Sequence, residues 1–78
     1  MKTVSLVKLN EKEKAEVVSI LGGQMATKRL VDLGLTAGTR VKILKKAPLF
    51  GPVEIELRGS ALVLGQGLAA KILVRRGE

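Results

Sequence analysis

Two groups of residues in this chain have the types and the spacing that could do chemistry. The first is Gly65, Gly67 and Ala70, which match the G-x-G-x-x-A spacing of turns that approach a pyrophosphate. Such a turn works inside a unit of about 30 residues that carries a later acidic residue for the ribose. Here the chain ends soon after Gly65, and its last carboxylate is on terminal Glu78. We therefore interpret these glycines as a tight joint between a strand and a short helical turn.

The second group is Glu54 and Glu56, which stand two apart in an alternating, strand-like stretch. That spacing puts both carboxylates on one face, with Cα atoms roughly 6.5 to 7 Å apart, and could suit acid/base work or a hard cation. We expect Arg40 and Lys42 to face them from a neighbouring strand, with Arg58 next in the row. Exposed ion pairs worth about 0 to 1 kcal/mol are then the favoured interpretation.

The residue types needed for most catalysis are missing, since the chain has no histidine and no cysteine. The usual pairs of nucleophile and base, and the imidazole and thiolate ligands of transition metals, are therefore unavailable. The sequence predicts no enzyme, no cofactor and no metal site of its own. It favours a binding or regulatory module.

The charge balance is strongly basic, with a formal net charge of +7. Such a charge favours an acidic partner such as nucleic acid, an anionic membrane face or an acidic protein. Phe50 is the only aromatic residue, which counts against single-stranded nucleic acid because that binding usually depends on bases stacking on aromatic rings. The basic residues are also dispersed, so nucleic acid is the less favoured partner.

The best candidate contact is a loop whose tip carries an apolar pair between two prolines. Such a rigid apolar knob is typical of residues that anchor protein interfaces. The predicted partner-binding residues are Leu49, Phe50, Pro48, Pro52, Lys45 and Lys46, with Gly51 as a turn residue. The alternative is that this loop folds over one open end of the domain and Phe50 plugs it.

The stretch from 30 to 44 combines a helix end, a tight turn and the start of a strand. Gly34 follows the last helical residues, where a left-handed residue without a Cβ is favoured, and Leu35 can then fold back onto Leu30. Gly38 permits a second reversal. The alternation that begins at Arg40 indicates a strand with one wet and one dry face.

The same reasoning along the whole chain predicts a mainly β fold with short helices, in the form of a small, partly open barrel of about five strands. Met25 or Ala26, Leu30 and Leu33 form the buried stripe of the one longer helix. The expected elements are a capping turn in 5–14, strands at 15–21, 40–46, 53–58, 61–64 and 72–75, a helix at 24–33 and a helical turn at 65–71.

The size and composition indicate one small domain, residues 1–78, which buries roughly 60 to 65% of the surface of its unfolded chain. No signal-peptide pattern is present, and no run approaches the roughly 20 apolar residues of a membrane span. We therefore expect a cytoplasmic protein without membrane insertion.

An ordered set of motifs covers nearly the whole chain: V..ILGG, then RLVDLGLTAG, then PLFGPVEIEL, and A..I.V near the end. With these motifs the chain resembles the FeoA family of ferrous-iron transport accessory proteins, whose domain also forms the C-terminal part of some iron-dependent repressors. The resemblance implies an SH3-like β-barrel in the cytoplasm. It also implies a partner, the membrane-embedded ferrous-iron transporter FeoB, whose cytoplasmic portion is a G-protein domain.

The chain departs from the family pattern in two places. Residues 10–14 are polar and charged where the family tends to carry Pro and Gly, and residues 65–68 lack the charged residues usual there. Transition metal ion binding is a description of the family, and this chain has no soft ligand for it.

The leading hypothesis is a non-enzymatic accessory protein that docks on the cytoplasmic part of FeoB through the loop of Leu49 and Phe50 and through basic strand edges. Two alternatives belong to other classes. One is a small basic barrel that binds nucleic acid. The other is a regulatory module that associates with itself and buries Leu49 and Phe50 against a sister chain.

Overall fold

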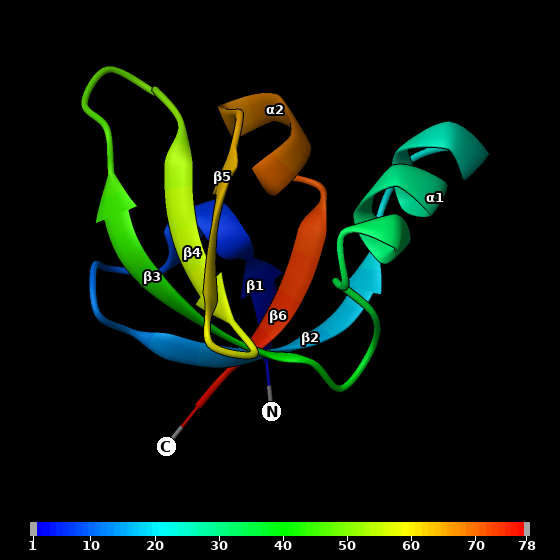
Figure 1. Ribbon diagram of the computed structural model, residues 1–78, viewed down its shortest axis with the longest axis horizontal. Coiled ribbons are helices and arrows are strands. Elements are labelled where there is room, and N and C mark those ends of the chain that lie inside the picture. The colour runs from blue at the N-terminus through cyan, green and yellow to red at the C-terminus, as the bar shows by residue number, and fades with distance from the viewer. Residues whose placement is uncertain (1, 78) are drawn as a thin grey trace.

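The computed structural model describes residues 2–77 and shows a six-stranded antiparallel sheet that curls around a single core (Figure 1). The strand order is β1-β6-β2-β3-β4-β5, so β1 and β5 are the two edges. In chain order the elements are β1 (Thr3–Ser5), the 3-10 helix η1 (Leu6–Lys8), β2 (Lys14–Ile20), α1 (Gln24–Asp32), β3 (Arg40–Lys46), β4 (Val53–Leu57), β5 (Ser60–Leu64), α2 (Gln66–Ala69) and β6 (Ile72–Arg76). The predicted mainly β fold with short helices is confirmed. The prediction of five strands was one short, and the sheet is not closed.

The strand that the sequence did not reveal is β1. The predicted capping turn exists as η1, but Thr3, Val4 and Ser5 before it pair with β6 at the far end of the chain. A three-residue strand shows no clear period, because its conformation comes from its partner, here opposite Arg75 to Leu73.

The end of α1 has the predicted geometry. Gly34 adopts φ +97°, and its N–H donates to the Val31 carbonyl at 2.9 Å. The Leu35 N–H donates to the Leu30 carbonyl at 2.9 Å, and both leucine side chains are fully buried. These two bonds and the apolar contact are those of a Schellman motif, which redirects the chain towards β3.

The core is filled from every strand and from the segments that close the sheet. β4 buries Val53, Ile55 and Leu57 on one face, and β3 buries Val41 and Ile43, as their alternation predicted. Leu6 and Leu9 close one side of the core, and Leu30, Leu35, Ala69 and Leu64 fill the rest.

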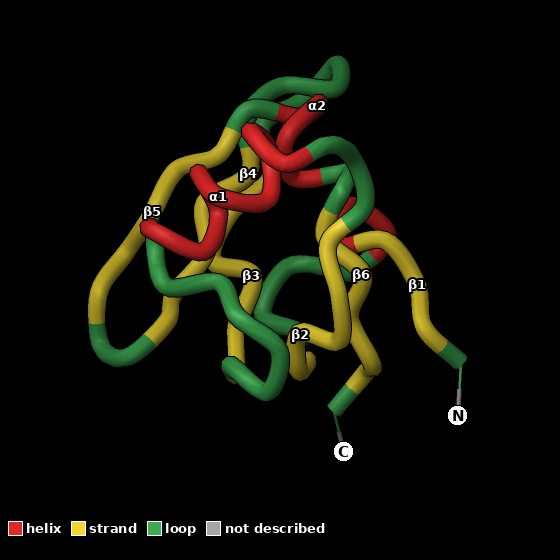
Figure 2. Tube along the Cα trace, turned by 90° about the vertical axis from the view of Figure 1, so that its right-hand side faces the viewer, coloured by secondary structure: helices red, strands yellow, loops and turns green. Residues whose placement is uncertain are grey.

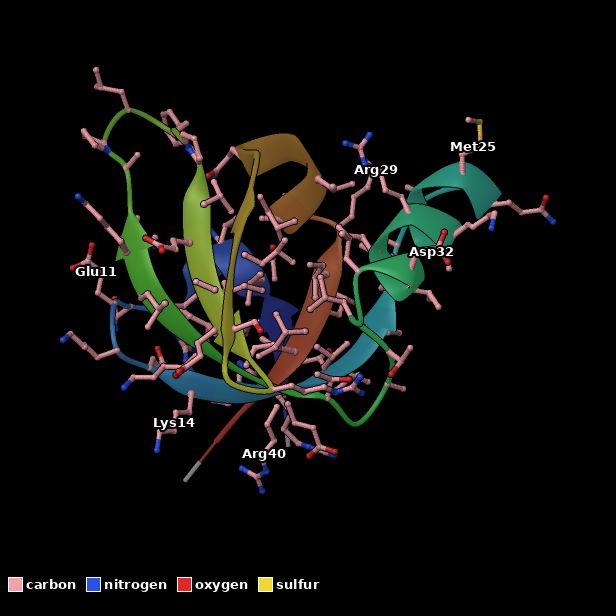
Figure 3. The ribbon with its side chains drawn as sticks, in the orientation of Figure 1. Glu11, Lys14, Met25, Arg29, Asp32 and Arg40 are labelled. Atoms are coloured by element: carbon pink, nitrogen blue, oxygen red, sulfur yellow. The ribbon has the colours of Figure 1, made fainter. Side chains whose placement is uncertain are left out.

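The predicted buried stripe of α1 was partly right, since Leu30 is buried and Ala26, the alternative to Met25, is half-buried. Leu30 is fully buried, but Met25 is 88% exposed and Leu33 is 40% exposed. Figure 3 shows Met25 at the outer end of α1, pointing away from the sheet. Figure 1 shows the reason: α1 stands at the right-hand side of the sheet and does not lie across its face, and in Figure 2, seen from that side, it lies in front. Leu30, near its C-terminal end, is its buried residue.

The β3–β4 hairpin contains an irregularity that changes the predicted charge pairs. Lys42 lies opposite Glu56 as expected, but a register shift after Ile43 places Lys45, not Lys42 or Arg40, opposite Glu54. Among residues 2–77, neither glutamate has a basic nitrogen within 4.0 Å. The predicted ion pairs across this hairpin are therefore absent in the described residues, even between Lys42 and Glu56, which lie directly opposite each other.

The shortest ion pair among residues 2–77 joins β6 to the turn before β2. Arg76 Nε donates to Glu13 Oε2 at 2.7 Å, and the Asn10 N–H donates to Glu13 Oε1 at 2.9 Å. Arg76 also donates to the Lys8 carbonyl at 3.1 Å. The hydrogen bond from the Asn10 N–H lowers the pKa of Glu13 below its ordinary value; burial opposes this effect, and the hydrogen bond and charge of Arg76 lower the pKa further.

A carboxylate with a lowered pKa stabilises the fold above its unfolded pKa and loses that contribution as the pH falls through the folded pKa. We expect Glu13→Gln to lower the free energy of unfolding at pH about 6, and expect this difference to shrink towards pH about 3. Urea unfolding of both proteins across that range measures it. A difference that stays constant with pH would contradict this account of Glu13.

Candidate partner-binding site

The loop from 47 to 52 connects β3 and β4 and is closed by its own hydrogen bonds. The Ala47 N–H donates to the Pro52 carbonyl at 3.0 Å, and the Gly51 N–H donates to the Pro48 carbonyl at 3.1 Å. Gly51 has a steric role, because a Cβ there would stand 2.8 Å from the Cβ of Ala47. The loop projects at the upper left of Figure 1, away from α1 and from both chain ends.

The two residues at the tip have an unusual backbone. Leu49 and Phe50 adopt φ values of +58° and +59°, the left-handed region that favours glycine. A positive φ at both central positions is the pattern of a type I′ turn, which normally carries Asn, Asp or Gly. Each non-glycine residue there costs roughly 1 to 2 kcal/mol. The loop thus retains two large apolar residues at positions where the fold alone favours glycine.

Neither side chain is used to build the fold. Leu49 is 93% exposed and Phe50 is 85% exposed. The alternative in which Phe50 plugs an open end of the domain is therefore wrong. Exposing such side chains forgoes roughly 1.5 to 3 kcal/mol each relative to burial, which an apolar partner could recover.

The two lysines at the base of the loop differ in their surroundings. Lys45 is exposed, and no carboxylate lies within 4.0 Å of it in residues 2–77. The Lys46 ammonium donates to the Val7 carbonyl at 3.0 Å and to the Leu9 carbonyl at 2.9 Å. The backbone N–H of Lys46 also donates to Glu11 Oε2 at 2.9 Å. Lys46 therefore joins the loop to the N-terminal segment, a role that no sequence pattern revealed.

A separate basic surface lies away from the loop. Lys14, Arg40, Lys42 and Arg58 line a shallow depression of about 360 Å³, which Glu56 also borders. Lys14 and Lys42 are directly opposite each other in the sheet, an arrangement in which like charges repel. Figure 3 shows Lys14 and Arg40 projecting at the bottom, opposite the loop. This surface is the observation that favours an anionic partner.

Residues 2–77 contain no group of three or more acidic side chains placed to hold a metal ion. No helix within that range is long and apolar enough to cross a membrane.

The six-stranded curled sheet, its short helices and its exposed apolar loop define a small SH3-like β domain. Within this class the chain belongs to the FeoA family, because the model of the FeoA domain matches residues 4–76.

The relatives agree with this assignment in sequence and in structure. The chain is 38% identical over 68 residues to the putative Fe(2+) transport protein A of Methanocaldococcus jannaschii, covering 87% of this chain and 80% of that protein. A crystal structure titled iron uptake regulatory protein (FeoA) superposes with a TM-score of 0.90 at 37% identity, over 97% of this chain and 100% of the other.

The fold also occurs inside a longer protein. A manganese-dependent transcriptional repressor superposes with a TM-score of 0.91 over 99% of this chain but 38% of its own length. At 16% identity this likeness shows the fold alone.

The two lysines of the loop base provide a matched test of the structure. Lys46→Met keeps the apolar stem but removes two charge-assisted hydrogen bonds, so we expect the free energy of unfolding to fall by about 1.5 to 3 kcal/mol. Lys45→Met removes an exposed charge that has no carboxylate near it in the described residues. This substitution should change the free energy of unfolding by less than about 0.5 kcal/mol. Urea denaturation followed by far-UV circular dichroism measures both. Equal effects of the two substitutions would contradict the role of Lys46.

Proposed function

We propose that this chain is a non-enzymatic, cytoplasmic accessory protein of ferrous iron transport that docks on the cytoplasmic G-protein portion of a FeoB-type transporter. Membership of the FeoA family and the name of the Methanocaldococcus jannaschii relative support a role in ferrous iron transport. The partner and the docking surface are the finer parts of the proposal. They depend on the geometry of the loop.

The observation that carries the docking surface is the pair Leu49 and Phe50. They are the two most fully exposed large apolar residues of the loop, and both have a backbone that costs free energy without helping the core. Strain of this kind clusters at functional sites, where another requirement outweighs stability. Here that requirement would be binding, with Leu49 and Phe50 buried in an apolar pocket of a partner.

The loop is also suited to binding because little of it must become ordered. Its two internal hydrogen bonds and its two prolines already restrict the backbone, and Lys46 holds its base. A preorganised contact avoids much of the entropy cost of association. Lys45 beside the tip, together with the net charge of +7, would steer the loop towards an acidic rim around the pocket.

The nucleic-acid alternative depends on the basic surface around Lys14, Arg40, Lys42 and Arg58. The nucleic-acid alternative and the docking proposal predict different salt dependences of binding in the same titration. Phosphate binding weakens steeply with salt, in proportion to the phosphates neutralised. Burial of an apolar loop depends on salt only through its acidic rim, and it responds to changes at Phe50.

Phe50→Gly separates the effect of the loop tip on stability from its effect on partner binding. We expect this variant to raise the free energy of unfolding by about 0.5 to 1 kcal/mol, because glycine removes the left-handed strain but has a more flexible unfolded chain. We expect its affinity for the purified cytoplasmic portion of FeoB to fall about 30-fold, the equivalent of roughly 2 kcal/mol. Chemical denaturation and isothermal titration calorimetry measure the two effects.

Met25→Ser is the matched control, since Met25 is similarly exposed but lies at the outer end of α1. It should leave the affinity within about twofold. Equal losses in the two variants, or unchanged binding in Phe50→Gly, would contradict docking through the loop. A parent protein that sediments as a dimer while Phe50→Gly is monomeric would favour the self-associating alternative.

A further inference from the structure

The second unusual surface is the free edge of β5. β5 pairs only with β4, and the sheet ends there. The two strands are joined by Arg58 and Gly59, with φ values of +51° and +80°, which is the pattern of a two-residue type I′ hairpin. Leu57 and Ser60 flank this turn as the first pair of the ladder.

The position of the turn determines which backbone groups are free. In a two-residue hairpin the flanking pair is hydrogen-bonded, and bonded and non-bonded pairs then alternate. Ser60, Leu62 and Leu64 therefore bond to β4, while the N–H and C=O groups of Ala61 and Val63 point away from the sheet. Among residues 2–77, no turn, loop or side chain hydrogen-bonds to those outward groups.

This edge lacks the features that natural edges use to prevent pairing. Such edges carry charges, prolines or bulges, or are very short. The stretch from Gly59 to Ala70 has no charged residue and no proline, and its register with β4 is unbroken. Val63 is 62% exposed and Ala61 is exposed. The opposite edge, β1, is only three residues long.

A groove follows the inner side of this edge and ends at α1. It has a volume of about 240 Å³, and its apolar lining comes from Leu33, Leu57, Ala61 and Leu62. Leu57 packs over Gly34, where a Cβ would stand 3.3 Å from its Cδ1. The groove can therefore receive an apolar side chain that points inward from an added strand.

A cation lies at the end of the groove nearest the turn. One terminal nitrogen of Arg58 is 3.9 Å from the position of a Cβ on Gly34, which places the guanidinium beside the groove. No carboxylate within residues 2–77 lies within 4.0 Å of it. A guanidinium in this position can accept a carboxylate from a ligand in bidentate geometry.

We propose that the β5 edge binds, by antiparallel strand addition, an extended segment of another protein in which an apolar residue is followed two positions later by an acidic one. The apolar residue lies opposite Leu62 and enters the groove. The acidic residue lies opposite Ser60, on the same inward face, and meets Arg58. The residues on either side of the apolar one bond to Ala61 and Val63, as in other cases of β-augmentation.

A second copy of this chain fits the edge less well. Pairing of β5 with itself around Leu62 would place Leu64 of the second copy opposite Ser60, where Arg58 calls for a carboxylate. Each copy also carries a net charge of +7, which opposes self-association. The proposal does not depend on the partner of the Leu49 and Phe50 loop.

The test uses the full chain and the peptide acetyl-Thr-Thr-Leu-Thr-Glu-Thr-Thr-amide. We expect the amides of Ala61 and Val63 to exchange quickly in the free protein and to become protected with peptide present. Chemical-shift changes should centre on residues 57–64 and on Leu33 and Gly34. The control peptide is N-methylated at the two threonines that flank the leucine. It lacks the two donors and should bind at least tenfold more weakly.

Variants of the protein separate the backbone from the charge contribution. Ala61→Pro removes an N–H that faces away from β4, and should weaken binding at least tenfold with the β4 ladder intact. Val63→Lys provides a second block of the edge if Ala61→Pro does not fold. Arg58→Glu should lower the affinity for the parent peptide about tenfold. The variant should bind more tightly to the peptide that carries Lys in place of Glu.

Three results would overturn the proposal. The first is an absence of protection at Ala61 and Val63 at saturating peptide or at the solubility limit. The second is a set of shifts centred on Leu49 and Phe50, which would place the peptide on the loop. The third is protection of the edge that depends on protein concentration without peptide, which would make a second copy the occupant.

Discussion

The position of β6 between β1 and β2 is the constraint on which the rest of the structure depends. The last strand of the chain pairs with the first along Thr3 to Ser5 and with β2 along Ala15 to Ile20. Until β6 is in place, Val74 and Ile72 cannot cover the core, and η1 lacks one of the two elements that it contacts most, the other being α2. Pairings of such long sequence separation carry a large loop-closure cost and slow folding. The Arg76 to Glu13 ion pair adds a polar bond at the same seam.

Local sequence signals predicted the elements whose conformation is decided locally. The Schellman turn at Gly34, the limits of β3 and the start of β4 follow from glycine chemistry, alternation and proline. β1 could not be found this way, because the extended conformation of a three-residue strand is determined by pairing with its neighbour, here β6. The burial of α1 was misjudged for a related reason: Met25 and Leu33 have the right spacing, but the angle at which α1 leaves the sheet decides what is covered.

The candidate site could be predicted in position but not in detail. Two prolines around Leu49 and Phe50 indicated an apolar loop tip, yet the same sequence was also compatible with a loop that folds over one open end of the domain. The positive φ values at both residues could not be anticipated, because neither residue type favours that conformation. The register shift that places Lys45 opposite Glu54, and the attachment of Lys46 to Val7 and Leu9, arise from three-dimensional packing that no period in the sequence encodes.

Phe50 is the only ring-bearing aromatic side chain in the molecule, since the chain has no Trp, Tyr or His. All non-exchangeable proton signals in the aromatic region of its spectrum therefore come from one residue at the tip of the β3–β4 loop. In D₂O, once the amide protons have exchanged, the free and bound environments of that tip can be followed through a single spin system without isotope labels. The protein thus contains its own spectroscopic reporter, placed at the tip of the β3–β4 hairpin, where docking is expected.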